Sequence, residues 1–281
     1  MTGRSAKALL RLGREHLAGQ TAGALEAEVL LAYALDVNRA WLYANGETIP
    51  GEQKEARYLE LVERRRKGEP IAYLTGIREF WSLPLRVNPH VLIPRPETEL
   101  LVQTVLDFVP PTAAFRIADL GTGSGAVALA IASERPACEV HATELSPQAL
   151  AVARENGEKL LPGRIHFHLG SWLEPLTGTF HAIISNPPYV AADDPHLDQG
   201  DCRYEPRLAL TPGHAALSAI EQIAADARAV LEPGGMLAFE HGFDQAEEVR
   251  QILRELEYTR IESYTDLENR ERVTCGMRPA G

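Results

Sequence analysis

The sequence has little cysteine, few aromatic residues and no long apolar run. Its 281 residues include three cysteines and 6% aromatic residues. Cys138, Cys202 and Cys275 lie far apart and outside metal-binding spacings, which argues against a disulfide scaffold and a zinc-type site. No apolar stretch approaches the roughly 20 residues that span a bilayer, and the first residues lack the apolar core and cleavage site of a secretion signal. We therefore expect a cytoplasmic protein with free thiols, no metal and no membrane partner.

An excess of basic residues is also missing. The chain has 28 Lys and Arg against 39 Asp and Glu, for a formal net charge of −11. One basic cluster, Arg64-Arg65-Arg66-Lys67, is interpreted as a solvated helix end whose cations lie at the negative end of the helix dipole, a partner-binding patch being the alternative. Because phosphate contacts need clustered cations, the composition disfavours a nucleic-acid-binding protein.

The chain divides into three stretches by pattern. Residues 1–76 show leucines at helix-like spacing and few polar groups suited to chemistry, which predicts a small helical bundle for substrate docking. Residues 77–94 hold β-rich runs around Pro84 and predict a β-hairpin that acts as a connector. Residues 95–281 alternate short β-rich runs with helical stretches, and such alternation predicts an α/β domain with a parallel sheet covered on both faces.

Strands and helices follow one another regularly in this last stretch. The strands are predicted at Arg116–Leu120, Glu139–Thr143, Ile165–Leu169, Ala182–Ser185, Met236–Glu240, Arg260–Tyr264 and Val273–Met277. The helices are predicted at Ala126–Ser133, Pro147–Lys159, Ala215–Leu231 and Gln245–Glu257.

A glycine-rich turn, Gly121-Thr122-Gly123-Ser124-Gly125, follows the first predicted strand. Its glycines let the backbone turn sharply and let a cofactor approach where no Cβ stands in the way. Glu144 ends the next strand, and its carboxylate can accept hydrogen bonds from both hydroxyls of a ribose. These features fit a dinucleotide and S-adenosylmethionine equally well. Asp119, just before the glycines, favours the cationic sulfonium, because its carboxylate would repel a pyrophosphate.

A second polar segment, Ser185-Asn186-Pro187-Pro188-Tyr189, directly follows an apolar strand. Its two prolines fix φ and remove backbone donors, so the loop offers mainly acceptors. The Asn186 side-chain oxygen and the Pro187 carbonyl can hold the two protons of an NH2 group and direct its nitrogen toward a methyl donor. The ring of Tyr189 can stack on a planar group. The segment therefore predicts methyl transfer to a planar, NH2-bearing nitrogen.

Together these two segments resemble the class I methyltransferases that act on exocyclic or amide nitrogens. Further runs are similar to those of the peptide chain release factor N5-glutamine methyltransferases, at Glu69–Gly76, Ile93–Glu99, Tyr204–Pro206 and Arg270–Val273. The resemblance implies a Rossmann-like seven-stranded sheet with the last strand antiparallel, preceded by an N-terminal helical bundle and a β-hairpin. It also implies methylation, with S-adenosylmethionine, of the side-chain amide N5 of the glutamine in the Gly-Gly-Gln motif of bacterial class 1 release factors.

The resemblance assigns roles to individual positions of this chain. The cofactor would contact Gly121, Thr122, Gly123, Ser124, Gly125, Glu144 at its ribose, Trp172 at its adenine, and Asn186. The substrate glutamine would be held by Asn186, Pro187, Pro188 and Tyr189, with Asn186, Pro187 and Tyr189 as the catalytic residues. Two positions depart from the family pattern. Ser171 replaces a common acidic residue, which puts an adenine contact in doubt, and Asn269 replaces a common glycine.

Several other activities remain open. A glutamine methyltransferase of a ribosomal protein would use the same loop, and an adenine-N6 nucleic-acid methyltransferase would also meet a planar NH2 group, although the acidic charge disfavours it. An NAD-dependent oxidoreductase would explain Glu144 and the glycines but not the loop at 186–189, and a docking protein without catalysis would need no such motifs. His166, His168 and His181 are interpreted as structural. We expect a monomer that acts on release factors and binds no nucleic acid directly.

Overall fold

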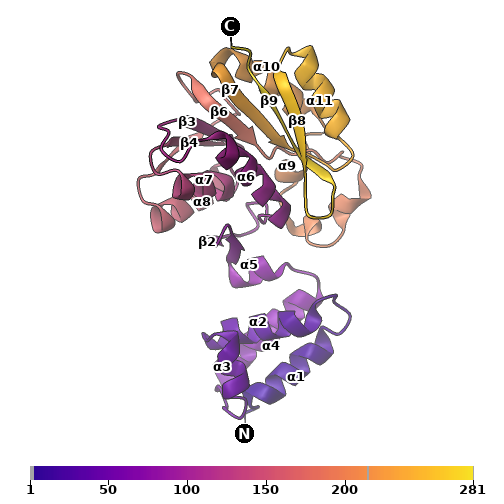
Figure 1. Ribbon diagram of the computed structural model, residues 1–281. Coiled ribbons are helices and arrows are strands. Elements are labelled where there is room, and N and C mark those ends of the chain that lie inside the picture. Colours follow the sequence, from indigo (N-terminus) through magenta and orange to yellow (C-terminus); the bar gives the residue numbers. More distant parts are fainter. Residues whose placement is uncertain (1–2, 214, 281) are drawn as a thin grey trace. The chain divides into compact units, whose positions relative to one another are not determined.

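The structure, a computed structural model, describes residues 3–213 and 215–280. The chain divides into two compact units, one ending at Ile77 and the other beginning at Arg78. The first unit is built from helices and the second from a helix-covered sheet (Figure 1). None of the helices in the described ranges combines the length and the apolar content that crossing a membrane requires.

The first unit is the expected small helical bundle. Its helices are α1 (Ala6–His16), α2 (Gly23–Leu35), α3 (Arg39–Ala44), α4 (Glu52–Arg66) and α5 (Ile71–Thr75). Leu9, Leu30 and Tyr58 are among the fully buried side chains of its core. A Cβ at Gly13 would lie 1.7 Å from the Tyr58 hydroxyl, so this glycine is what lets α1 approach α4. The bundle is held by ordinary apolar packing at helical spacing.

The basic cluster at residues 64–67 forms the end of α4, as the sequence indicated. Arg64, Arg65 and Arg66 occupy its last turn, where cations complement the helix dipole. Arg64 pairs with Glu69 at 2.6 Å and Arg65 pairs with Glu26 at 2.8 Å. Arg66 pairs with Glu63 at 2.8 Å. These pairs account for the three arginines within the unit itself.

A buried carboxylate, Glu28 of α2, joins three helices of this unit. It accepts hydrogen bonds from Arg14 and Arg39, both at 2.7 Å, and from the Tyr43 hydroxyl at 2.6 Å. The Tyr43 hydroxyl, helped by the two arginines and opposed by burial, lowers the pKa of Glu28 to about 2. The carboxylate is therefore charged at neutral pH, and its partners compensate the cost of burying it.

The second unit has a β-hairpin at its start. Strands β1 (Ile77–Phe80) and β2 (Leu83–Arg86) pair across Trp81 and Ser82. These two turn residues have φ of 50° and 58°, and positive φ at both central positions is the pattern whose twist matches a two-residue hairpin. The β-rich run at residues 91–93, which the sequence analysis grouped with the hairpin, forms no strand.

A seven-stranded sheet follows, in the order β5-β4-β3-β6-β7-β9-β8. Its strands are β3 (Arg116–Leu120), β4 (Glu139–Glu144), β5 (Ile165–Leu169), β6 (Phe180–Ser185), β7 (Leu231–Glu240), β8 (Thr259–Thr265) and β9 (Glu271–Met277). Strands β3 to β7 pair in parallel, whereas β9 is antiparallel to both of its neighbours. The predicted sheet with an antiparallel last strand is confirmed.

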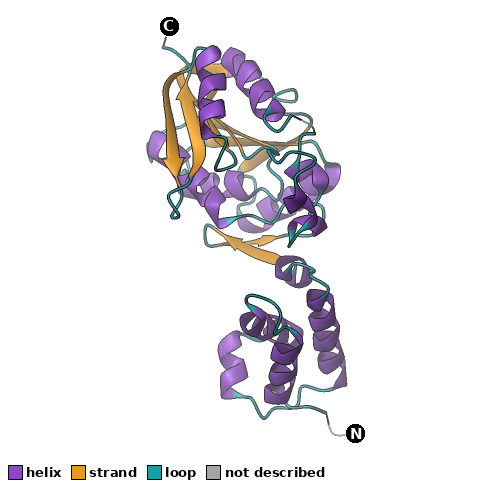
Figure 2. Ribbon diagram, turned by 90° about the vertical axis from the view of Figure 1, so that its right-hand side faces the viewer, coloured by secondary structure: helices purple, strands orange, loops and turns teal. Residues whose placement is uncertain are grey.

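Helices cover both faces of this sheet (Figure 2). Successive side chains of a strand point to opposite faces of the sheet. In β3, Ile117 packs in the core cluster that holds the helices at residues 99–108 and 126–134. Its neighbour Ala118 packs in the cluster that holds the helices at residues 218–230 and 246–255. The long helices are α6 (Glu99–Phe108), α7 (Ala126–Glu134), α8 (Pro147–Leu160), α10 (Ser218–Val230) and α11 (Ala246–Glu255). Shorter elements are η1 (Pro96–Thr98), η2 (Pro195–Asp198), η3 (Cys202–Tyr204) and α9 (Arg207–Leu210).

Some element boundaries differ from the sequence prediction. No helix was expected over residues 99–108, yet α6 forms there because its buried residues pack against the sheet with α7. Helix α10 begins at Ser218 rather than Ala215. Strand β7 begins at Leu231 rather than Met236, because Leu231 pairs with Phe180 across a register shift. Asn269 has a φ of 59°, the left-handed conformation that asparagine tolerates better than most residues.

We expect Glu28→Gln to destabilise the first unit by about 1–3 kcal/mol, because the charge that Arg14, Arg39 and Tyr43 contact is lost from a buried position. Hydrogen exchange of peptides from residues 3–76 of the full chain measures this change apart from the rest of the molecule. Glu15→Gln is the matched control, since Glu15 lies exposed on α1. Equal protection in wild type and Glu28→Gln would show that the buried carboxylate does not stabilise the unit.

Candidate active site

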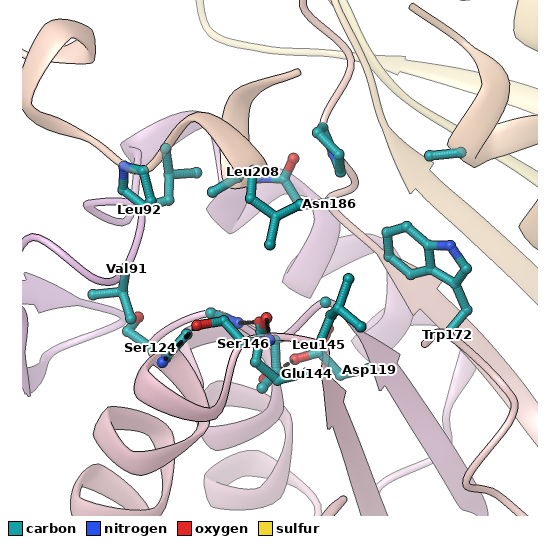
Figure 3. A pocket seen from close by; sticks show the side chains of 18 of the residues that line it. Val91, Leu92, Asp119, Ser124, Glu144, Leu145, Ser146, Trp172, Asn186 and Leu208 are labelled. Carbon is teal, nitrogen blue, oxygen red and sulfur yellow. Dashed lines mark hydrogen bonds between the residues drawn. The ribbon is translucent and has the colours of Figure 1, made fainter. Parts of the chain in front are cut away.

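A cavity of about 480 Å³ lies at the carboxyl ends of the central strands, within the usual size range of small-molecule sites. Of the residues predicted from sequence, the cavity is lined by Gly121, Thr122, Gly123, Ser124, Glu144, Trp172, Asn186 and Pro188. Gly125, Pro187 and Tyr189 are not in its lining. Figure 3 shows Trp172 across the cavity from Val91 and Leu92, with Asn186 facing the same space. The two segments singled out in the sequence thus share one pocket.

The glycine turn is held against the neighbouring strand by backbone hydrogen bonds. The amides of Gly121 and Thr122 both donate to the Thr143 carbonyl at 2.9 Å. Gly121 and Gly123 have φ of 71° and 58°, a conformation that glycine adopts without steric cost. Gly125, with φ of 85°, is the N-cap of α7 and turns the chain into that helix behind the cavity.

Glu144 stands at the end of β4, where it contacts two loops. One carboxylate oxygen accepts from the Gly123 amide and the other from the Ser146 amide, each at 2.9 Å. A carboxylate has about four acceptor positions, so these two bonds leave capacity for a ligand. Both amides also fix the direction of the carboxylate before any ligand binds.

Asp119 makes the floor of the cavity acidic. It is buried, and its Oδ2 accepts from the Thr122 hydroxyl at 2.6 Å and from the Ala128 amide at 3.2 Å. Burial raises the pKa of Asp119 to about 6, against the effect of these two hydrogen bonds, and the Glu144 charge raises it further. A cation bound nearby would favour the ionised form of this carboxyl.

Asn186 follows β6 and points its side chain at the cavity. Its Nδ2 donates to the Thr98 hydroxyl at 3.2 Å. Among the described residues its amide oxygen has no hydrogen-bond partner. The Asn186 oxygen is therefore available at the cavity as the acceptor that the sequence analysis predicted for a substrate NH2 group.

Tyr189 supports the same loop from outside the cavity lining. Its hydroxyl donates to Oε1 of Glu240 at 3.4 Å, and its carbonyl accepts from the Gln245 side chain at 3.0 Å. Burial, followed by the Glu240 charge, raises the pKa of Tyr189, so the phenol is neutral at physiological pH. These contacts fix the backbone of the loop that carries Asn186.

Two motif segments far apart in the chain meet beside this loop. Glu205 is buried, accepts from the Ile93 amide at 2.9 Å and forms an ion pair with Arg95. Burial raises the pKa of Glu205, against the opposing effect of Arg95. The run at residues 93–99 is thus joined to the run at 204–206 by a buried hydrogen bond and an ion pair.

Several residues of the site were not found from the sequence. Thr98 lines the cavity, Glu240 lies behind it, and buried Asn156 donates to the Ser124 carbonyl at 2.9 Å. Glu240 carries the same local signal as Glu144, an acidic residue at the end of an apolar strand, and could have been found from that signal. Thr98 lies in the run Ile93–Glu99 that resembles the family, but no role was assigned to it, and Asn156 lies within α8 and carries no comparable signal.

The histidines interpreted as structural lie away from this cavity. His181 stacks on Phe115 with ring centroids 4.2 Å apart. His168 lies 3.1 Å from His141, nitrogen to nitrogen, and His166 stacks on His141. Within the described ranges, no group of three or more histidine, cysteine, aspartate or glutamate side chains is arranged to hold a metal ion.

Comparison with known proteins identifies relatives along nearly the whole chain. Residues 8–76 match the PrmC N-terminal domain, and residues 96–200 match the methyltransferase small domain. The chain is 48% identical over 263 residues to the release factor glutamine methyltransferase of Burkholderia pseudomallei, covering 91% of this chain and 92% of that protein. It is 47% identical over 252 residues to that of Salmonella typhimurium, covering 89% and 91%.

Solved structures with a similar fold have much lower sequence identity. A methyltransferase from Pyrococcus furiosus is 17% identical with a TM-score of 0.55, covering 77% of this chain and 97% of that one. The 16S rRNA N2 G1207 methyltransferase of T. Thermophilus, solved with AdoMet and guanosine, is 18% identical with a TM-score of 0.54, covering 72% and 49%. At such identities the likeness shows the fold alone.

We expect Gly121→Ala to weaken S-adenosylmethionine binding by at least about tenfold, because alanine is strained at this φ and relief of about 1–3 kcal/mol of strain would displace the turn assigned to the cofactor. Its Cβ would also lie 3.1 Å from the Trp172 ring. Gly163→Ala is the matched control, since Gly163 has a φ of 70° and open space around it. Titration calorimetry should show normal affinity in the control. Normal affinity in Gly121→Ala as well would exclude a tight cofactor contact at this turn.

Proposed function

Since this chain belongs to the release factor glutamine methyltransferases, we propose that it transfers the methyl group of S-adenosylmethionine to the side-chain amide N5 of the glutamine in the Gly-Gly-Gln motif of class 1 release factors. The observation that carries the proposal is the Asn186 side chain at the cavity, with its amide oxygen available to an NH2 donor. The identity to the relatives extends over about nine tenths of each chain, so it includes both units.

The chemistry of the cavity fits this cofactor. Glu144 offers a carboxylate suited to ribose hydroxyls, and the ring of Trp172 offers a flat apolar surface suited to an adenine. The acidic Asp119 at the floor suits a cation better than a pyrophosphate. S-adenosylmethionine, when bound, would supply a methyl group that its sulfonium makes electrophilic, and cleavage of the S–CH3 bond would leave S-adenosyl-L-homocysteine. The glycine turn at 121–125 is assigned to the same molecule.

The residues of the loop at 186–189 orient the substrate amide. An amide NH2 conjugates its lone pair with the carbonyl, so its nitrogen is a weak nucleophile that depends on alignment. The Asn186 oxygen and the Pro187 carbonyl would accept hydrogen bonds from its two N–H groups and direct the nitrogen. Pro188, which lines the cavity, would bound the substrate side chain, and Tyr189 would hold the loop from outside the lining. As positive charge develops on the nitrogen, the hydrogen bond to Asn186 strengthens, and such a differential interaction lowers the barrier.

The first unit is assigned to recognition of the protein substrate. Its core is apolar, and the cavity is lined by residues of the second unit alone. The remaining parts of the proposal are a monomeric enzyme in the cytoplasm, with release factors as its protein partners and no direct contact to nucleic acid or membrane. Residues 77–94 are assigned as the connector between residues 1–76 and the methyltransferase domain at 95–281.

We expect Asn186→Ala to lower turnover by at least about hundredfold, the scale for loss of one preorganised polar group. Affinity for S-adenosylmethionine should change far less, because the lost hydrogen bond belongs to the substrate. The measurement is initial rate at saturating cofactor and release factor, with calorimetry for cofactor affinity. Asn269→Ala is the control, since Asn269 is exposed in the turn between β8 and β9, and it should turn over as wild type. Unchanged turnover in Asn186→Ala would remove this residue from the mechanism.

We further expect a chain that begins at Arg78 to bind S-adenosylmethionine with normal affinity but to methylate intact release factor far more slowly. All residues that line the cavity lie in the second unit, so the shortened chain keeps them. The proposed docking surface belongs to the first unit, so the shortened chain lacks it. A short peptide that contains the Gly-Gly-Gln motif should be methylated at the same rate by both chains. If the shortened chain turned over intact release factor as fast as the full chain, the first unit would have no role in recognition.

A further inference from the structure

The side-chain amide of Asn186 can face the cavity in two ways, and only one serves the proposed function. Its NH2 donates to the Thr98 hydroxyl, which leaves the oxygen for the cavity. Turning the amide by half a rotation would present NH2 to the substrate NH2, two donors that cannot bond. The group that keeps the Thr98 hydroxyl acting as an acceptor therefore determines whether the Asn186 oxygen faces the substrate.

Thr98 is held at the junction of η1 and α6. It is 4% exposed and lines the cavity. A hydroxyl both donates one proton and accepts, so it acts as an acceptor toward Asn186 reliably only when its own proton has another acceptor. The acceptor available nearby is the carboxyl of Glu240: the Thr98 hydroxyl favours the charged form of this carboxyl, and its Oε2 is buried without a hydrogen-bond partner among the described residues.

The sheet register brings Glu240 to this place. In the parallel pair of β6 and β7, Ser185 lies opposite Phe239, so Asn186 and Glu240 leave the sheet side by side. Glu240 is 2% exposed, and its Oε1 accepts from the Tyr189 hydroxyl. Its Oε2 has no partner in hydrogen-bond geometry among the described residues. A buried carboxylate oxygen without a partner is costly, and such groups are concentrated where they serve function.

We propose that Glu240, acting through Thr98, is a positioning residue that keeps the oxygen of the Asn186 amide directed into the cavity. In this arrangement the free Oε2 of an ionised Glu240 accepts a hydrogen bond from the Thr98 hydroxyl, so the Thr98 oxygen keeps its lone pair for the NH2 of Asn186. The same carboxylate accepts a hydrogen bond from the Tyr189 hydroxyl. Glu240 therefore acts on Asn186 through Thr98 and on Tyr189 directly. This inference rests on the proposed function, in which the Asn186 oxygen accepts from the substrate amide.

The network predicts a pH dependence. Burial raises the pKa of Glu240 to about 7; the Thr98 and Tyr189 hydroxyls and Arg272 act against this shift, and the Glu97 charge adds to it. A protonated Glu240 is a donor, which frees Thr98 to donate to the Asn186 oxygen and turn the amide. Because the ionised form is the working one, turnover should be full above this pKa and should fall as pH drops below it.

Thr98→Val tests the relay, because valine keeps the shape of threonine and lacks the hydroxyl. We expect turnover on release factor to fall by at least about tenfold, with cofactor affinity within about twofold of wild type. Thr98→Ser, which keeps the hydroxyl, should restore most of the turnover. Thr104→Val is the matched control, since Thr104 is a buried threonine of α6 whose hydroxyl bonds the Leu100 carbonyl and does not line the cavity. It should turn over as wild type.

Glu240→Gln tests the charge, and its readout is the pH profile of kcat from pH 5.5 to 9. We expect the fall on the acid side to be lost in this variant and kept in Thr104→Val. Wild-type turnover in Thr98→Val, failure of Thr98→Ser to restore a loss, or an unchanged acid limb in Glu240→Gln would each overturn the positioning role and leave the proposed function standing. No methylation of release factor by the wild-type chain would overturn both.

Discussion

The active site depends on the parallel register of four adjacent strands, β4, β3, β6 and β7. Each strand delivers one polar side chain to the same edge of the sheet: Glu144, Asp119, Asn186 and Glu240 in that order. The carboxyl ends of parallel strands meet at one edge, which is where ligands of open α/β sheets bind. A slip of one residue in any pair would direct these side chains into the wrong face. The Ser185 hydroxyl, which donates to the Leu120 carbonyl at 2.7 Å, ties β6 to β3 at that edge.

The electrostatics of the cavity follow from this burial. Asp119 and Glu240 lie on either side of Asn186 in strand order, and burial raises the pKa of both carboxyls, to about 6 and about 7. A site of this kind is poorly suited to an anion and well suited to a cation. The amide of Asn186 is neutral, so it can accept a proton-bearing nitrogen without a competing charge. Fixed polar groups in a dry cavity require little reorganisation during reaction, which is the main source of electrostatic catalysis.

The sequence predicted the sheet well because its strands are short, apolar and separated by turn residues. The bounds of β3 and β5 agree with prediction, and both motif segments line one cavity. The prediction missed α6, although its buried apolar residues recur at helical spacing, and it assigned no role to Thr98 in η1. The roles of Glu240 and Asn156 depend on strand register and on contacts with residues far away in the chain. Local pattern also could not separate Asn186, which faces the cavity, from Tyr189, which supports the loop from outside its lining.

The fold alone does not choose the substrate. The 16S rRNA methyltransferase described above shares the fold, with a TM-score of 0.54, although its name gives a nucleic-acid substrate. Family membership is what favours the glutamine amide of a release factor, because the loop at 186–189 would serve other planar NH2 groups as well.

The most direct test is to incubate the full chain with S-adenosylmethionine labelled in its methyl group and an unmodified class 1 release factor, then map the labelled peptide by mass spectrometry. The account predicts one label, on the side-chain amide of the glutamine in the Gly-Gly-Gln motif, and none when that glutamine is replaced by alanine. A release factor that stays unlabelled, or label on another residue of it, would contradict the account.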